Sequence, residues 1–193
     1  MGLLSWLQRK AQEEVPGTRV LVCALGADFD DLLKVDSEIW TRYYESVTIA
    51  QLASIGELSE RISRCYDVVH LFCHVSPRGE ILDGLGGQVQ GTDLIAACCR
   101  SGVKLLWFGS GSKPEAYVNG FKAKGKPINL VLTIDRQGLK AQIALDKLLS
   151  RLSTGDRMPI AWVKLWPQVP GLAHPDAPEA IFFSGRPGVV LLK

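Results

Sequence analysis

Short apolar segments alternate with helical patterns along most of this chain, and this alternation is the strongest constraint on its fold. Five segments read as strands: residues 46–51 are rich in β-branched side chains, and residues 18–25, 68–73, 103–108 and 128–133 carry near-continuous apolar runs. The segments between them carry apolar residues at helical spacing, most clearly at Ala141, Leu145, Leu148 and Leu152. Strands that alternate with helices predict a mainly parallel sheet with helices on both faces.

The length of 193 residues fits one domain with a sizeable core. We expect a helical extension at residues 1–17 and a single α/β domain at residues 18–193. The predicted architecture is a three-layer sandwich whose central sheet has about six strands. Helices are predicted at 30–43, with Leu32, Val35, Ile39 and Tyr43 on one face, and at 55–65, 92–101 and 137–152. A hairpin or ordered loop is predicted at 78–91. From Thr154 onward, frequent prolines predict a long loop with closing strands at 181–183 and 189–192.

Composition argues against several functional classes. The net charge is only +2, which gives no electrostatic footprint for nucleic acid. No apolar run approaches the length that spans a bilayer. The five cysteines are odd in number and lie mostly in apolar patterns, so we expect free, buried thiols in a reducing, cytoplasmic environment. The absence of a Cys-x-x-Cys pair argues against a structural zinc site, and we expect no cofactor.

The first residues of the chain read as an amphipathic helix. Leu3, Leu4 and Leu7 share a helical face, and positive charge follows them rather than preceding them as in a secretory signal. We expect this helix to pack on the domain or on a partner, with contact to a membrane surface as the alternative.

Two of the apolar segments end in residues that suggest chemistry. Residues 67–74 end on His74, and residues 104–112 end in a loop of small residues. Because the carboxyl ends of neighbouring parallel strands meet at one edge of a sheet, we expect His74 and this loop to lie close together. His74 is a candidate general base, and Ser110 and Ser112 are the only side chains of the loop that could serve as its nucleophile. A strand-end histidine with only a structural hydrogen bond is the alternative.

The same loop offers a second kind of site. Gly109, Gly111 and the predicted start of a helix present backbone N–H groups, and Lys113 adds positive charge, as a small anion or a carboxylate would require. A plain strand–helix turn capped by Ser112 is the alternative. The usual phosphate-binding glycine motifs are missing, but a doubly wound nucleotide-binding domain stays open as an alternative.

The other candidate residues have structural explanations. His70 lies within an apolar run and reads as a buried core histidine, and His174 is the only further histidine, so no metal site is expected. Asp28, Asp30 and Asp31 follow the first strand, where they could hold Mg²⁺ or cap the next helix. Cys98 and Cys99 read as small core residues, and Cys73 is expected to point to the opposite face from its neighbour His74.

The order of these elements resembles the caspase/haemoglobinase-like fold, and most closely its CHAT branch among the clan CD cysteine peptidases. In that family a strand of the form apolar-apolar-His-apolar-small-x-His supplies the catalytic base, and Val68–His74 is similar to it, with Cys73 where a glycine commonly stands. An insert similar to 79–91 follows, then a helix similar to 92–101. Next comes a strand that ends in Asn-x-Cys, to which Leu105–Gly111 is similar. The tail at 177–185 is similar to the last strand of the family.

The resemblance implies roles for individual positions. His74 takes the position of the base, and Gly111 takes the position of the nucleophilic cysteine. It therefore implies a catalytically inactive peptidase-like domain that acts as a regulatory module by binding a protein or peptide. An active hydrolase that uses His74 with Ser110, Ser112 or a displaced cysteine is the alternative.

Overall fold

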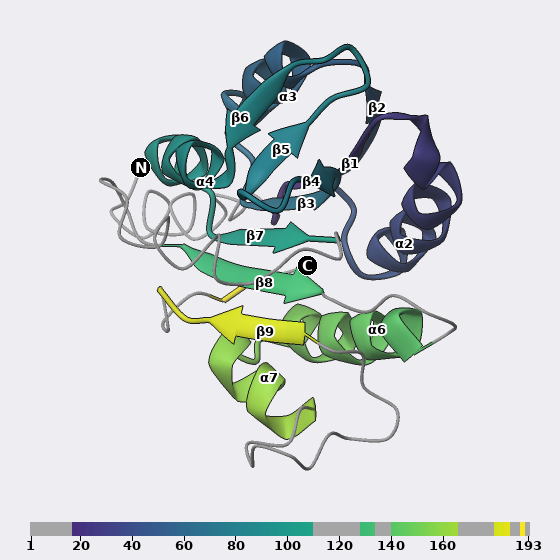
Figure 1. Cartoon of the computed structure of the whole chain (residues 1–193). Coiled ribbons are helices and arrows are strands. Elements are labelled where there is room, and N and C mark those ends of the chain that lie inside the picture. Colours follow the sequence, from purple (N-terminus) through teal and green to yellow (C-terminus); the bar gives the residue numbers. More distant parts are fainter. Residues whose placement is uncertain (1–16, 110–127, 134–139, 166–179, 186–189, 192–193) are drawn as a thin grey trace, which may run out of the picture.

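The computed structural model describes residues 17–109, 128–133, 140–165, 180–185 and 190–191 (Figure 1). Their framework is a sheet with the strand order β2-β1-β3-β7-β8-β9, in which the first five strands are parallel and β9 is antiparallel to β8. The strands are β1 (Val20–Leu25), β2 (Val47–Leu52), β3 (Val68–Phe72), β7 (Leu105–Phe108), β8 (Asn129–Thr133) and β9 (Ala180–Phe183). The predicted α/β class with a mainly parallel central sheet is confirmed.

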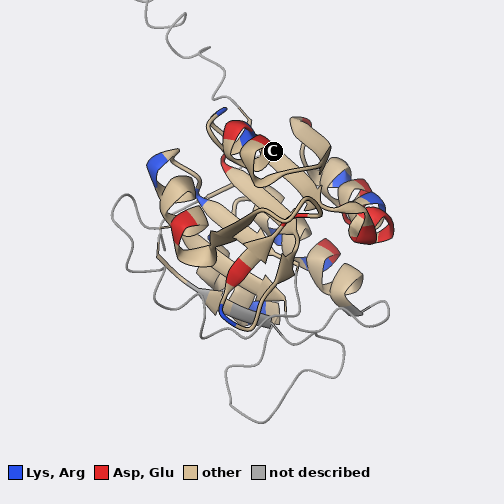
Figure 2. Ribbon diagram, turned by 45° about the horizontal axis from the view of Figure 1, so that its top comes forward, with Lys and Arg blue, Asp and Glu red and all other residues tan. Residues whose placement is uncertain are grey.

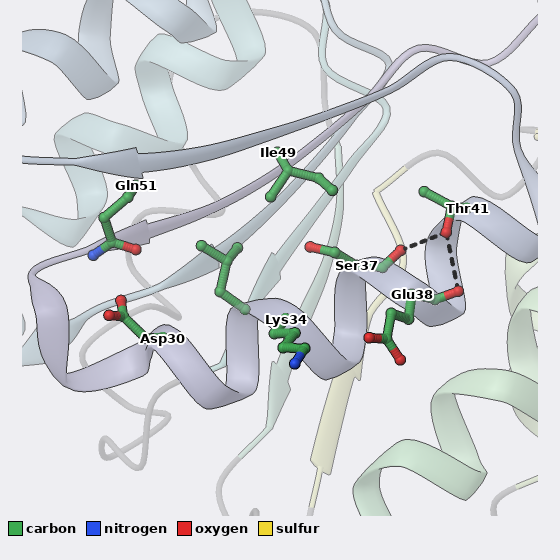
Figure 3. A pocket seen from close by; sticks show the side chains of 8 residues that line it. Asp30, Lys34, Ser37, Glu38, Thr41, Ile49 and Gln51 are labelled. Atoms are coloured by element: carbon green, nitrogen blue, oxygen red, sulfur yellow. Dashed lines mark hydrogen bonds between the residues drawn. The ribbon is translucent and has the colours of Figure 1, made fainter.

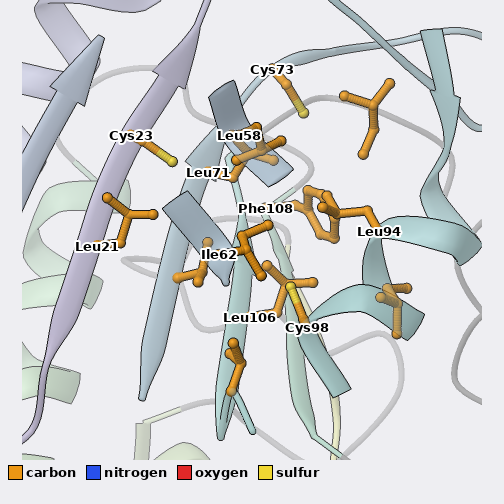
Figure 4. Close-up of a cluster of buried hydrophobic side chains, with 14 of the residues drawn as sticks. Leu21, Cys23, Leu58, Ile62, Leu71, Cys73, Leu94, Cys98, Leu106 and Phe108 are labelled. Atoms are coloured by element: carbon orange, nitrogen blue, oxygen red, sulfur yellow. The ribbon is translucent and has the colours of Figure 1, made fainter. Parts of the chain in front are cut away.

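Helices pack against this sheet through two separate apolar clusters. Odd and even strand residues point to opposite faces, so β1 contributes Val20 and Val22 to one cluster and Leu21 and Cys23 to the other. One cluster includes residues of α2 (Asp30–Tyr43), α6 (Lys140–Ser153) and α7 (Met158–Leu165). The other includes residues of α3 (Ile55–Ile62) and α4 (Gly91–Arg100), as Figure 4 shows. This two-sided burial is why the inner strands β1, β3 and β7 are apolar at almost every position rather than at every second one.

A second, three-stranded antiparallel sheet follows β3 directly. It consists of β4 (His74–Val75), β5 (Glu80–Leu82) and β6 (Gln88–Gln90), where a hairpin or ordered loop was predicted. The turn between β5 and β6 is held by Asp83, whose carboxylate accepts N–H groups of Ile55, Gly87 and Leu85. These hydrogen bonds lower the pKa of Asp83, and the bond from Ile55 has the largest effect. The same bond ties the small sheet to the first turn of α3.

The buried face of α2 differs from the prediction, although the helix has the predicted bounds. Val35 is 39% exposed, whereas Asp36, Ser37 and Trp40 are buried. The Nε1–H of Trp40 donates to Nδ1 of His70 on β3 at 2.9 Å. Because this polar contact lies in the core, it fixes the rotation of the helix. Of the predicted face, Ile39 is buried and Leu32 and Tyr43 are partly buried against the same cluster, so the apolar spacing was wrong only for Val35.

The region after Thr154 contains a helix that the sequence analysis did not predict. In α7, Met158 and Ala161 are buried against the sheet and α6. Pro159 stands in the first turn of this helix, where the N–H that proline lacks has no intrahelical acceptor. The closing strand at 181–183 is confirmed as part of β9, and the described part of 189–192 forms an isolated bridge between Val190 and Arg157.

Two further features concern the chain as a whole. Positive and negative residues are interspersed over the described helices and turns (Figure 2). Within the described residues, no helix is long and apolar enough to cross a membrane. Residues 1–16 of the predicted helical extension lie outside the described residues.

Gly109 is the position where this packing leaves no room for a side chain. Its N–H donates to the Leu71 carbonyl at 2.9 Å, and a Cβ there would lie 2.5 Å from the fully buried ring of Phe72. We expect Gly109→Ala to lower the free energy of unfolding by about 1–3 kcal/mol, measured by urea denaturation. Gly56→Ala, whose Cβ would meet only Ser54 Oγ at 3.6 Å, is the matched control and should not destabilise the protein. Equal stability of the two variants would contradict the packing.

Candidate functional site

His74 and Asp28 form an exposed hydrogen-bonded pair at the edge of the sheet where the parallel strands have their carboxyl ends, here called the carboxyl edge. Asp28 lies in the short helix η1 (Ala27–Phe29) after β1, and His74 follows β3, the strand next to β1. Nε2 of His74 lies 2.8 Å from Oδ2 of Asp28. The side chains are 57% and 76% exposed, so the pair is open to a ligand from solvent.

The surroundings of His74 fix its orientation. The ring of Phe29 packs against the imidazole at 4.8 Å between centroids. An ionised carboxylate only accepts hydrogen bonds, so Nε2 carries the proton and donates to Asp28. In the neutral imidazole the lone pair then lies on Nδ1, which can accept a hydrogen bond from a ligand or take a proton from one.

The start of the small-residue loop lies at the same edge. β7 pairs with β3, and the bond from Gly109 N–H to the Leu71 carbonyl continues that pairing to the end of the strand. Gly109 is buried and its N–H is already donated to Leu71, so it does not present that N–H to an anion as predicted. Ser110, Gly111, Ser112 and Lys113 lie outside the described residues.

The thiols of the described chain do not reach His74. Cys73 precedes His74, but its side chain is buried in the cluster between the sheet and helices α3 and α4 (Figure 4). Burial raises the pKa of Cys23 and of Cys98 well above the usual thiol range, which favours the unreactive thiol form. The helix predicted at 55–65 ends at Ile62, so Cys65 lies beyond it, where it is exposed and has a φ of 63°.

His70 is a core histidine, as predicted. It is fully buried, accepts the hydrogen bond from Trp40, and stacks on Trp107 at 5.3 Å between ring centroids. Its Nε2 lies 3.5 Å from a carboxylate oxygen of Asp36, which is also fully buried. This network joins α2 to β3 in the interior and is closed to ligands. No group of three or more metal-ligating residues lies in the part of the chain that the structure describes, Asp28, Asp30 and Asp31 included.

Sequence reasoning did not find two features of the surface. Asp28 was predicted to be a helix cap or a Mg²⁺ ligand. Asp28 follows β1 and His74 follows β3, and the carboxyl ends of these neighbouring strands could have indicated that the two side chains meet. Sequence reasoning also missed a groove of about 500 Å³ between α2 and β2 (Figure 3). We call this the α2–β2 groove; its lining is Asp30, Leu33, Lys34, Ser37, Glu38, Thr41, Ile49 and Gln51.

Comparison with known proteins does not identify the site. No protein-family model matches the sequence, and no curated protein is significantly similar to it. The chemistry of the site is therefore inferred from the residues themselves.

The burial of the thiols predicts how they react in the folded protein. We expect an aromatic disulfide reagent at neutral pH to modify Cys65 rapidly, while Cys23, Cys73 and Cys98 react only on unfolding, because they are fully buried. Peptide mass mapping after a short exposure measures the modified positions. Rapid modification of Cys73 or Cys98 in the native state would contradict this and would supply the thiol that His74 lacks.

Proposed function

We propose that this chain is a caspase/CHAT-like domain without a catalytic nucleophile, which binds an extended protein or peptide segment at its carboxyl edge. The observation that carries the proposal is the exposed His74, oriented by Asp28, at the edge where β7 also ends. An imidazole held in one orientation offers a ligand a defined acceptor at Nδ1.

The order of the elements supports the resemblance on which this proposal rests. After β3 and His74 come the small antiparallel sheet, then α4, then β7 and the small-residue loop. This is the succession of insert, helix and strand that the resemblance implies. The proposal assigns the two helix clusters and the sheet between them to a three-layer sandwich of the caspase type.

Binding fits the residues better than thiol catalysis does. Glycine stands at position 111, where the resemblance implies the nucleophilic cysteine, and the cysteines nearest in sequence to the site are buried. A bound segment would meet the Nδ1 acceptor, the Asp28 carboxylate and the aromatic ring of Phe29 side by side. These groups suit a peptide that presents backbone N–H donors and an apolar side chain.

An active hydrolase is the second candidate, and one observation favours it. A serine nucleophile needs a base that is itself oriented by a third group, and Asp28 orients His74 in that manner. The nucleophile would be Ser110 or Ser112. A fluorophosphonate probe with peptide mass mapping separates the candidates: modification of either serine in the wild-type protein, lost in His74→Ala, would establish the hydrolase and overturn the pseudoenzyme.

Peptide binding gives the direct test of the proposal. Peptides are selected from a random display library on the wild-type protein, and the affinity of a fluorescent copy is measured by anisotropy. We expect His74→Ala and Asp28→Ala to weaken binding about tenfold each. His74→Ala removes the acceptor of a hydrogen bond from the peptide, and Asp28→Ala removes the group that orients this acceptor. Asp31→Ala removes a nearby exposed carboxylate on α2 and should leave binding unchanged. Equal affinity of all the variants would place the peptide elsewhere.

Restoring a thiol tests the position of the nucleophile. We expect Gly111→Cys to react with a peptidyl acyloxymethyl ketone at least about tenfold faster than Gly111→Cys combined with His74→Ala, because a neighbouring base generates the thiolate. The rate is measured by intact-protein mass spectrometry, with Cys65→Ser in both backgrounds to remove the exposed thiol. Equal rates in the two variants would show that position 111 does not face His74.

A further inference from the structure

The outer side of β2 has free backbone groups in the described sheet. β2 is the terminal strand of the sheet order and pairs with β1 alone. The carbonyls of Ser46 and Leu52 accept hydrogen bonds from β1 and from the residue after it. Since successive residues of a strand turn their backbone groups to opposite sides, Val47, Ile49 and Gln51 direct their N–H and C=O groups away from β1.

The α2–β2 groove lies along this same edge. Ile49 is 51% exposed, and Figure 3 shows Ile49 and Gln51 pointing from β2 toward α2. Leu33 adds an apolar wall, and the buried hydroxyl of Ser37 has no hydrogen-bond partner among the described residues. An exposed isoleucine on an edge strand invites the addition of another strand, which proteins usually prevent with a charge or a proline at such a position.

Charges on α2 indicate what that strand belongs to. Lys34 and Glu38 line the groove one helical turn apart, and both are exposed. α2 and β2 run in opposite directions, with Asp30 near Gln51 at one end of the groove, so Ile49 lies level with the middle of the helix (Figure 3). A two-fold axis beside Ile49 would place β2 antiparallel to β2 of a second copy, and α2 antiparallel to α2 on the same face of the joined sheet.

This symmetry makes the charges self-complementary. Lys34 and Glu38 lie on either side of the axis, so Lys34 of each copy would face Glu38 of the other. Ile49 would form a hydrogen-bonded pair with Ile49 of the second copy, and Val47 would pair with Gln51 on both sides. The two isoleucines would then cover each other at the junction of the two grooves.

We propose that the α2–β2 groove is a self-association surface, through which two copies join their sheets by antiparallel pairing of β2 and exchange two Lys34–Glu38 contacts. The proposal is independent of the site at His74, which lies at the carboxyl edge rather than on the outer side of β2. Self-complementary charge favours a second copy over an unrelated extended segment as the occupant.

Charge reversal in trans tests this proposal with the full chain. Sedimentation velocity over a concentration series should show a dimer for the wild type. Lys34→Glu and Glu38→Lys should each raise its dissociation constant about tenfold or more, because two attractive contacts become repulsive. An equimolar mixture of the two variants should associate as the wild type does, since every contact across the axis is then again attractive. Association restored in the mixture cannot arise from a charge pair within one helix, because residues 34 and 38 carry the same charge in each variant.

Control variants separate the groove from general effects. Lys147→Glu makes the same charge change at an exposed position of α6, so it should neither weaken the dimer nor rescue Glu38→Lys in a mixture. Ile49→Lys, which places two positive charges opposite each other on the paired strands, should abolish association while the circular dichroism spectrum is unchanged. A wild type that stays monomeric up to about 1 mM, or association that survives the charge reversals and Ile49→Lys alike, would overturn the proposal.

Discussion

The burial of β1, β3 and β7 on both faces is the constraint on which the rest of the structure depends. Apolar side chains on either side of these strands leave no position for an exposed polar group along their length. The exception within β3, His70, is accommodated by the hydrogen bond from Trp40 on α2. Groups that can meet a ligand are therefore displaced to the strand ends, which is where Asp28 and His74 lie.

The position of His74 results from two independent attachments. One is the Asp28 carboxylate, which approaches from the end of β1. The other is the small sheet: His74 pairs with Leu82, and the next residue, Asp83, accepts the N–H of Ile55 at the start of α3. The histidine is thus connected to the helices of one face through β5, and to the first strand through Asp28. Such double support holds a surface side chain in one orientation more firmly than a single hydrogen bond.

The elements were more predictable from the sequence than the contacts between them. Apolar runs located the inner parallel strands, because strands that are buried on both faces are apolar along most of their length. Apolar residues at helical spacing located the bounds of α2. The buried position of Trp40 on α2 was not predictable, since it depends on Trp40 meeting His70, a partner 30 residues away. The same holds for Asp28 and His74, which are 46 residues apart and meet only because β1 and β3 are neighbours. Pro159 was misleading for a local reason: proline marks both loops and the first turn of a helix.

The two proposed surfaces share one structural element, although they lie on different sides of the sheet. The residue after Phe29 is the first of α2, so the segment that carries Asp28 leads directly into the helix that lines the α2–β2 groove. The interior contact of Trp40, in the last turn of that helix, with His70 fixes the helix against the middle of β3. The continuous segment of η1 and α2, held from the core, thus carries Asp28 at the carboxyl edge and Lys34 and Glu38 beside β2. The rotation of α2 that this contact fixes is therefore also what places Lys34 and Glu38 on the groove.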